Sequence, residues 1–265
     1  MVILITGISS GFGLATARLL SQEGHLVYGT VRREVEPLPL VHYLKVDVRD
    51  AQAVQEAVRK IVEKEGRIDV LVNNAGMGIG GPVEFATEEE IRLQMDTNFI
   101  GLVNCVNAVL PIMRKQKQGK IIALSSIGGL MGLPFQGFYS ASKFAIEGYC
   151  ESLRLETRSY DIQVIVLRPG DFSTGFTGSR RKVGNEAALA AYPQYQIAME
   201  KVEHDERGGL KPEVLARKIN KVIQCRHPRH GYVVASLVQK LSVQAKRILP
   251  ARWFEAILRS YYKLY

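Results

Sequence analysis

The sequence has no long hydrophobic run and few cysteines, and each absence excludes a class of protein. No apolar stretch reaches the ~18 residues that a membrane-spanning helix requires. An apolar run begins at Val2 with no basic region or cleavage site, so we expect no signal peptide. The cysteines, Cys105, Cys150 and Cys225, have no metal-ligand spacing, and neither do the histidines. We therefore expect reduced thiols, no metal site and a cytoplasmic protein.

What the sequence does have is length and positive charge. Its 265 residues, 46% of them hydrophobic, are enough for one large α/β domain with a substantial core. The net charge of +9 favours acidic ligands, namely a phosphorylated cofactor, an anionic membrane surface or nucleic acid. We expect no nucleic-acid partner, because the chain has no known binding motif and no basic stripe interleaved with aromatics. A solvated basic face is the plainer explanation of most of the charge.

A glycine-rich turn follows the first apolar run and predicts an anion site. Residues 2–5 are typical of a buried parallel strand, and TGISSGFG (residues 6–13) leads into a helical pattern. Free N–H groups at a helix N-terminus bind phosphate. Gly7 would permit the tight turn, and Gly11 and Gly13 would permit close approach. A plain glycine turn before a helix is the alternative.

The next two strands predict the nucleotide that such a site would bind. The strand at about residues 26–31 ends in Arg32 and Arg33, where an NAD site usually has an acidic residue for the ribose. Two arginines could instead clamp a 2′-phosphate, which favours NADP(H), unless they are merely solvated. Asp47 follows the strand at 41–46. It could accept a hydrogen bond from adenine or belong to the cap of the next helix.

Amide and small residues continue the pattern. A strand at about residues 68–72 opens into NNAG (residues 73–76), where a ring can lie against the backbone. Thr87 begins a capping box and a long helix reaching about Lys117. Asn98 lies inside that helix, where asparagine is a mediocre helix former. It is either an incidental polar residue or part of a structured hydrogen-bond relay.

Three further residues could carry acid–base chemistry. Tyr139 and Lys143 are four residues apart, so a helix places them on one face. A neighbouring ammonium lowers the pKa of a phenol, which is otherwise near ~10. Ser126 follows a strand at about residues 119–125 and could hydrogen-bond a substrate oxygen. This set suits reversible carbonyl reduction if a hydride carrier lies alongside.

Taken together, these motifs resemble the short-chain dehydrogenase/reductase family over about residues 1–235. Their order and spacing match it in the following elements: residues 6–13, residues 73–76, Asn98, Ser126, Tyr139 with Lys143, and Pro169-Gly170 followed by Thr174. Residues 127–135, 144–148 and 151–153 resemble the hydroxysteroid and retinol dehydrogenase branch. The resemblance implies a single doubly wound Rossmann-type α/β domain with a mostly parallel sheet between helices. Residues 236–265 would then form a C-terminal helical extension.

The resemblance also implies residue roles. Tyr139 would be the general acid in reduction and the base in oxidation, and Lys143 would lower its pKa and bind the nicotinamide ribose. Ser126 would orient the substrate oxygen, and Asn98 would hold a water in a proton relay. The implied cofactor-binding residues are Gly7, Ser9, Ser10, Gly11, Phe12, Gly13, Arg32, Asp47, Val48, Asn74, Ala75, Gly76, Tyr139, Lys143, Pro169, Gly170, Phe172 and Thr174. NAD(H) stays open beside NADP(H), because residues 8–10 lack the basic residue of some NADP-preferring members.

These features predict an NADP(H)-dependent oxidoreductase that interconverts a secondary alcohol and a carbonyl. A substrate lid over about residues 171–209, irregular after Thr174, contains Tyr192, Tyr195 and Met199. Such a lid favours a lipophilic, steroid- or retinoid-like substrate, although a surface helix pair with ordinary packing is the alternative. The competing function is a non-catalytic NADP(H)-binding regulatory or scaffold protein of the same fold.

The C-terminal residues predict an amphipathic helix after Pro250. Trp253, Phe254, Ile257, Leu258, Tyr261 and Tyr262 recur at helical spacing, with charged residues on the other face. The helix could pack on its own domain or on a partner subunit, which we favour, or rest on an anionic membrane as a peripheral contact. The family resemblance further implies a homo-oligomer, a dimer or tetramer, formed through the helices near Asn98 and Tyr139.

Overall fold

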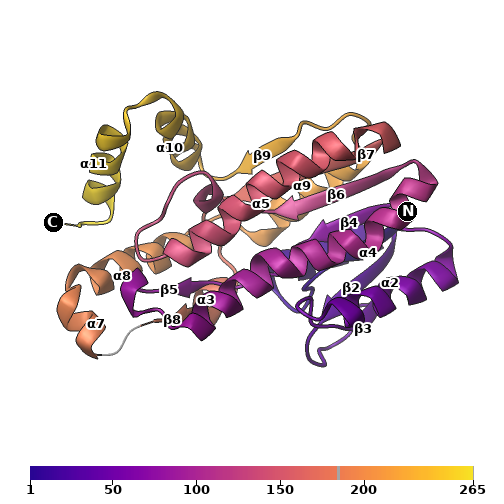
Figure 1. The fold of residues 1–265 in the computed structure, drawn as a ribbon, viewed down its shortest axis with the longest axis horizontal. Coiled ribbons are helices and arrows are strands. Elements are labelled where there is room, and N and C mark those ends of the chain that lie inside the picture. The colour runs from indigo at the N-terminus through magenta and orange to yellow at the C-terminus, as the bar shows by residue number, and fades with distance from the viewer. Residues whose placement is uncertain (184–185, 265) are drawn as a thin grey trace.

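A computed structural model describes residues 1–183 and 186–264 (Figure 1). Its centre is a seven-stranded parallel sheet with the order β3-β2-β1-β4-β6-β7-β9. The strands are β1 (Val2–Ile5), β2 (Leu26–Val31), β3 (Val41–Lys45), β4 (Val70–Asn73), β6 (Gly119–Leu124), β7 (Ile162–Pro169) and β9 (Gly231–Val234). The order reverses direction at β1, next to β4. Ligands of such sheets bind at this reversal, outside the carboxyl ends of the strands.

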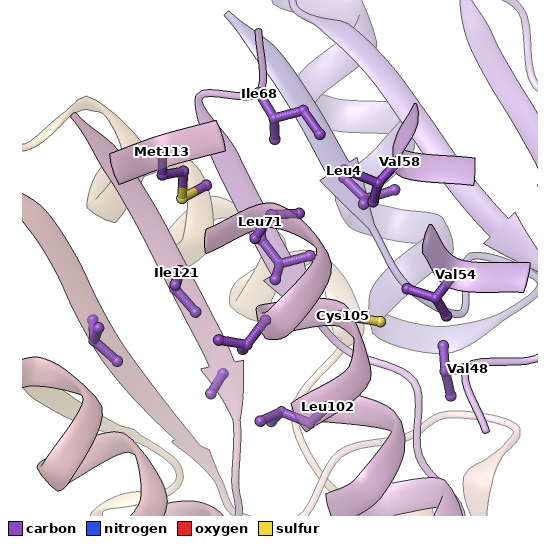
Figure 2. Packing of buried hydrophobic residues seen from close by; sticks show 14 of the residues in the cluster. Leu4, Val48, Val54, Val58, Ile68, Leu71, Leu102, Cys105, Met113 and Ile121 are labelled. Carbon is purple, nitrogen blue, oxygen red and sulfur yellow. The ribbon is translucent and has the colours of Figure 1, made fainter. Parts of the chain in front are cut away.

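Helices cover both faces of the sheet, so central strands such as β1 and β4 are apolar and buried along their length, whereas the edge strand β3 is only partly buried. On one face lie α1 (Gly11–Gln22) and α9 (Pro212–Gln224), and on the other α2 (Ala51–Glu65), α4 (Gly101–Gln116) and α5 (Gly137–Glu156). Along β1, Ile3 and Ile5 join the first layer, whereas Val2 and Leu4 join the second. Figure 2 shows this second layer, to which Leu71 and Ile121 of neighbouring strands and Cys105 of α4 belong. The predicted doubly wound α/β fold is confirmed.

The long helix predicted from Thr87 is present but has a wider turn within it. Thr87 caps α3 (Glu88–Met95) with the predicted capping box. A π-helical segment, η2 (Asp96–Ile100), then joins α3 to α4. Such π-segments occur often at functional sites, because the wider turn redirects side chains. Here the segment carries Asn98. The 3₁₀ segments are η1 (Val83–Phe85), η3 (Ile127–Gly129) and η4 (Arg158–Tyr160).

The prediction of an irregular lid after Thr174 was wrong for most of that segment. It contains α6 (Phe176–Ser179), β8 (Arg181–Lys182), α7 (Glu186–Ala191) and α8 (Gln194–Arg207), with β8 pairing to β5 (Ile79–Gly80); residues 184–185 lie outside the described part. Along α8, Tyr195, Ala198, Met199 and Val202 are buried. Their spacing of three, one and three is helical, and the surrounding charges hid it.

Two of the lid residues singled out from the sequence serve packing. The Tyr195 ring lies 5.1 Å from the Phe135 ring, and its hydroxyl donates to the Gly80 carbonyl at 3.3 Å. Met199 is also buried. For Tyr195 and Met199 the alternative of surface helices with ordinary packing therefore applies, whereas Val202 of the same helix lines the cavity described below.

The C-terminal residues form a helical hairpin, α10 (Leu237–Ile248) and α11 (Ala251–Tyr261), which stands at one end of the molecule in Figure 1. Val243 and Phe254 are buried against Ile127 and Met131 of the main domain. The favoured prediction, packing on its own domain, is confirmed for this side of the hairpin. In the described ranges, no helix is both long enough and apolar enough to cross a bilayer.

Candidate active site

The glycine turn between β1 and α1 has the geometry of a phosphate site. Gly7 and Gly11 have φ of +70° and +54°, a region that favours glycine. A Cβ added to Gly13 would lie 2.2 Å from the Gly7 carbonyl oxygen, so only glycine fits there. Ser10 precedes the helix and makes no side-chain cap, which leaves the first N–H groups of α1 without a cap from it. The turn thus fits the pyrophosphate of a dinucleotide.

Asn74 fastens this turn to the next strand. Its side-chain amide donates to the carbonyls of Thr6 and Gly7, each at 2.8 Å. The backbone N–H groups of Asn74 and Ala75 both donate to the Thr6 hydroxyl at 2.9 Å. The NNAG stretch therefore holds the glycine turn in place, in addition to lying at the cavity wall.

The ends of β2 and β3 form a cation-rich rim beside the turn. Arg32 and Arg33 are exposed and line the same cavity as Asp47 and Arg49. The Arg49 guanidinium donates to both Asp47 oxygens, at 3.1 and 2.6 Å. This hydrogen bond holds the pKa of Asp47 below its usual value, so Asp47 stays ionised. Arg49, which no sequence motif indicated, takes the ion pair with Asp47. Arg32 and Arg33 form no ion pair with a carboxylate among the described residues, which leaves their guanidinium groups available to a 2′-phosphate.

Ser126, Tyr139 and Lys143 meet at the carboxyl end of β6. Ser126 begins η3, and its Oγ accepts from the Gly128 N–H at 3.0 Å. Lys143 donates from Nζ to the Leu124 carbonyl at 2.9 Å and lies 5.7 Å from the Tyr139 ring centroid. The helix α5 places the phenol and the ammonium one turn apart, as their spacing predicts.

Burial decides how these two groups titrate. It raises the pKa of the Tyr139 phenol, and a hydrogen bond with Ser126 opposes this shift. It lowers the pKa of Lys143 to about 8. The net direction for Tyr139 is opposite to the lowering expected from the sequence, because desolvation disfavours the phenolate. At neutral pH the phenol is protonated and the lysine is mostly charged.

Asn98 belongs to a structured hydrogen-bond network. Its Oδ1 accepts from the Met77 N–H at 2.8 Å, and its Nδ2 donates to the Met77 carbonyl and the Ser142 Oγ, both at 3.0 Å. Ser142 in turn donates to the Tyr139 carbonyl at 2.7 Å. Asn98 therefore ties the loop between β4 and β5 to the helix α5 that carries Tyr139, and the alternative of an incidental polar residue does not hold.

One cavity of about 890 Å³ joins these parts. It is lined by every site residue predicted from the sequence except Gly13, which packs behind the turn, and Asn98, which lies behind Met77. Phe12 and Phe172 meet edge-to-face in its wall, with centroids 4.8 Å apart. The cavity also has lining residues that no sequence motif placed there: Met131, Leu133, Asp171, Val202, Asp205, Glu206, Val238, Gln239, Ile257, Leu258, Tyr261 and Tyr262.

The far end of this cavity carries carboxylates. Asp171 follows the Pro169-Gly170 turn, and its Oδ2 accepts from the Gln239 side chain at 2.7 Å. Burial, followed by the nearby charges of Glu206 and Asp205, raises the pKa of Asp171 to about 6. The position of Asp171 could have been predicted from the turn before it. Asp205 and Glu206 gave no such signal, because their helix was not recognised.

The carboxylates differ in whether a cation compensates them. Glu206 forms an ion pair with Arg180, and Asp205 forms one with Lys201 at 2.6 Å. Asp171 has only the neutral Gln239 amide as its side-chain partner within the described residues. Asp171 therefore has no ion-pair partner within the described residues, although the charge of Lys201 is near enough to oppose part of the rise in its pKa. A carboxylate without an ion pair at a cavity wall fits a cationic group on a ligand.

A family model described as short chain dehydrogenase matches residues 1–184. This chain belongs to the short-chain dehydrogenase/reductase family. It is an oxidoreductase of the kind that acts on CH–OH or carbonyl groups, and its glycine turn and rim fit a nicotinamide dinucleotide.

Two curated relatives and one solved structure are similar to this short-chain dehydrogenase along most of its length. The chain is 48% identical over 264 residues to a 3-ketodihydrosphingosine reductase of Bacteroides thetaiotaomicron, covering 99% of this chain and 98% of the relative. It is 38% identical over 253 residues to human 17-beta-hydroxysteroid dehydrogenase type 1, covering 87% and 76%. A closed form of serine dehydrogenase complexed with NADP+ superposes with a TM-score of 0.77 at 27% identity, covering 90% of this chain and 96% of that one. The predicted likeness to hydroxysteroid dehydrogenases is confirmed.

Proposed function

We propose that this enzyme uses NADPH to reduce a long-chain α-amino ketone, the chemical class of 3-ketodihydrosphingosine. The observation that carries the proposal is the cavity itself. It combines the Ser126, Tyr139 and Lys143 cluster with apolar walls and with the Asp171 carboxylate, which forms no ion pair among the described residues. The 48% identity to a 3-ketodihydrosphingosine reductase over nearly the whole chain supports the same substrate class. A steroid ketone has the apolar body but no ammonium group to meet Asp171.

Each part of such a substrate has a counterpart in the cavity. The ketone oxygen would accept hydrogen bonds from Ser126 and Tyr139, and the neighbouring ammonium would face Asp171. The alkyl chain would lie along the apolar lining residues Met131, Leu133, Val202, Ile257 and Leu258. A charged headgroup and an apolar chain thus bind in one continuous space, which orients the carbonyl for reaction.

When bound, NADPH supplies the hydride. The glycine turn would hold its pyrophosphate, and Arg32 and Arg33 its 2′-phosphate. Tyr139 donates its proton to the developing alkoxide, a role that its raised pKa favours because the phenol is protonated beforehand. Lys143, which lies beside the phenol, would bind the nicotinamide ribose and restore the proton of Tyr139. Asn98 would hold the water that continues this relay by accepting its hydrogen bond, since its Nδ2 already donates to Met77 and Ser142.

The proposal also includes the domain organisation, the assembly and the location of the enzyme. Residues 1–235 form the catalytic domain, with the lid at 171–209, and residues 236–265 form an extension that closes the substrate end. The enzyme is a cytoplasmic homo-oligomer with peripheral contact to a membrane.

Incubation with NADPH and 3-ketodihydrosphingosine tests the activity. If the protein bound NADPH tightly but oxidised it with no ketone, the scaffold function would be favoured instead.

Asp171→Asn is expected to raise KM for the amino ketone about tenfold or more, because a charge-assisted contact with the ammonium is lost. The matched control is a ketone of the same chain length without the amino group, whose KM should change less than about twofold. Steady-state NADPH oxidation with both ketones measures the difference. Equal losses on the two ketones would show that Asp171 only maintains the shape of the pocket.

The pH dependence of KM gives an independent test of Asp171. Its pKa of about 6 means that the carboxylate is charged above this pH and neutral below it. We therefore expect KM for the amino ketone to rise as the pH falls through about 6, and this rise to be absent in Asp171→Asn. The ketone without the amino group serves as the control at each pH. A profile unchanged by the substitution would contradict the assignment.

A further inference from the structure

The hairpin of α10 and α11 packs on the domain through Val243 and Phe254, and each of its helices also has apolar residues exposed to solvent. On α10, Leu237, Leu241 and Ile248 are exposed by 73, 60 and 78%. Their spacing of four and seven residues places them on one face of the helix. The residue that packs inward, Val243, lies on a different face. Isolated exposed leucines need no explanation, but a continuous stripe does.

The next helix repeats the arrangement. Trp253 and Ile257 are four residues apart on α11 and are exposed by 56 and 50%, whereas Phe254 between them is buried. We call Leu237, Leu241, Ile248, Trp253 and Ile257 the tail face. Figure 1 shows that the hairpin carrying it projects beyond the sheet and its covering helices, so it is accessible to a large partner.

Positive charge surrounds the tail face. The residues from 237 onward include Lys240, Lys246, Arg247, Arg252, Arg259 and Lys263 against the single acid Glu255. None of these cations forms an ion pair with a carboxylate in the part of the chain that the structure describes. Exposed aliphatic and tryptophan side chains flanked by unpaired lysine and arginine match the interface of an anionic bilayer. A symmetric pairing of two tail faces would instead bring like charges together.

The catalytic cavity reaches the surface beside this face. Val238, Ile257 and Tyr261 line the cavity and are also exposed, by 70, 50 and 45%. They come from both helices of the hairpin, so the hairpin forms part of the cavity mouth. An alkyl chain that leaves the cavity here passes the tail face.

We propose that the tail face docks on an anionic lipid bilayer and that the cavity mouth takes its long-chain substrate directly from the lipid. The proposal rests on the proposed function for its lipid substrate. The partner is the headgroup region of an anionic leaflet: the cations contact the headgroups, and the tail face enters the acyl boundary. A substrate with a charged headgroup and an alkyl chain lies in such an interface in the same orientation that the cavity requires.

Intrinsic fluorescence tests the docking directly, because Trp253 is the only tryptophan in the chain. Vesicles of phosphatidylcholine with phosphatidylglycerol should shift its emission to shorter wavelength, and brominated acyl chains should quench it. Vesicles of phosphatidylcholine alone, or high salt, should weaken both effects. Unshifted, unquenched emission with anionic vesicles would overturn the proposal, even if the enzyme reduces the amino ketone.

The double variant Leu241→Glu with Ile248→Glu tests the delivery step. Neither residue lines the cavity, so turnover of a short, water-soluble amino ketone should be unchanged. Vesicle flotation should be lost, and turnover of the long-chain ketone embedded in vesicles should fall about tenfold or more. The matched control is Leu40→Glu, at a loop residue exposed by 75% outside the tail face.

The outcomes separate this inference from the proposed function. Absence of turnover on both ketones in the unaltered enzyme would contradict the function, whereas the fluorescence result would still test the docking. Unchanged flotation of the double variant would overturn the inference. So would a lower molecular mass of the variant by light scattering, because the tail face would then be a contact between subunits.

Discussion

Tyr139→Phe is expected to lower kcat by about 10²–10⁴-fold, the usual contribution of a positioned general acid. The variant removes one hydroxyl, and the ring keeps its place between Lys143 and Phe176. NADPH affinity should therefore change by less than about twofold, since the glycine turn and the arginine rim are untouched. Steady-state NADPH oxidation gives kcat, and quenching of NADPH fluorescence gives the dissociation constant.

A second tyrosine of the same helix provides the control for this variant. Tyr149 packs edge-to-face on Phe99, with centroids 5.9 Å apart, and does not line the cavity. Tyr149→Phe should keep nearly full turnover. If Tyr139→Phe were as active as this control, another group would have to supply the proton, and the assignment of Tyr139 would be wrong.

Arg32→Asp is expected to raise KM for NADPH by about 10²-fold and to leave KM for NADH nearly unchanged. The substitution replaces a charge-assisted contact with a repulsive one at the 2′-phosphate, a change of about 2–4 kcal/mol. NADH lacks this phosphate, and an acidic residue at the end of β2 is the group that usually binds its ribose. The ratio of kcat/KM for the two nucleotides reports the change independently of enzyme concentration errors.

The control for Arg32→Asp needs the same change in net charge elsewhere. Arg226→Asp meets this need, since Arg226 is exposed and does not line the cavity. Its nucleotide ratio should match that of the unaltered enzyme. If Arg32→Asp left the ratio unchanged as well, the 2′-phosphate would have to lie elsewhere, and Arg33 and Arg49 would be the next candidates.

The cofactor half of the site was predictable because its residues form short contiguous motifs. The stretches at residues 6–13 and 73–76 each lie at a strand end, and a doubly wound sheet brings such ends together at one edge. Residues 139–143 lie in α5, the helix that follows β6. Local chain geometry, such as the positive φ of Gly7 and Gly11, suffices to shape them. The fold class was predictable for the same reason, because buried parallel strands give continuous apolar runs.

The substrate half was less predictable because it depends on tertiary contacts. Gln239 reaches Asp171 only because α10 packs on the main domain, and that packing depends on Phe254 meeting Ile127 and Met131. Nothing in the sequence pairs these distant residues. The raised pKa of Tyr139 is a similar case: the spacing to Lys143 was visible in the sequence, but the burial that raises the pKa of the phenol was not.

The most direct measurement follows deuterium from NADPH labelled at nicotinamide C4 into the product formed from 3-ketodihydrosphingosine. We expect mass spectrometry to find the label on the carbinol carbon of the amino alcohol, and Tyr139→Phe to abolish its appearance within the same time. If the enzyme bound NADPH tightly but transferred no label to this ketone, while it reduced a steroid or retinoid ketone readily, the proposed substrate class would be contradicted.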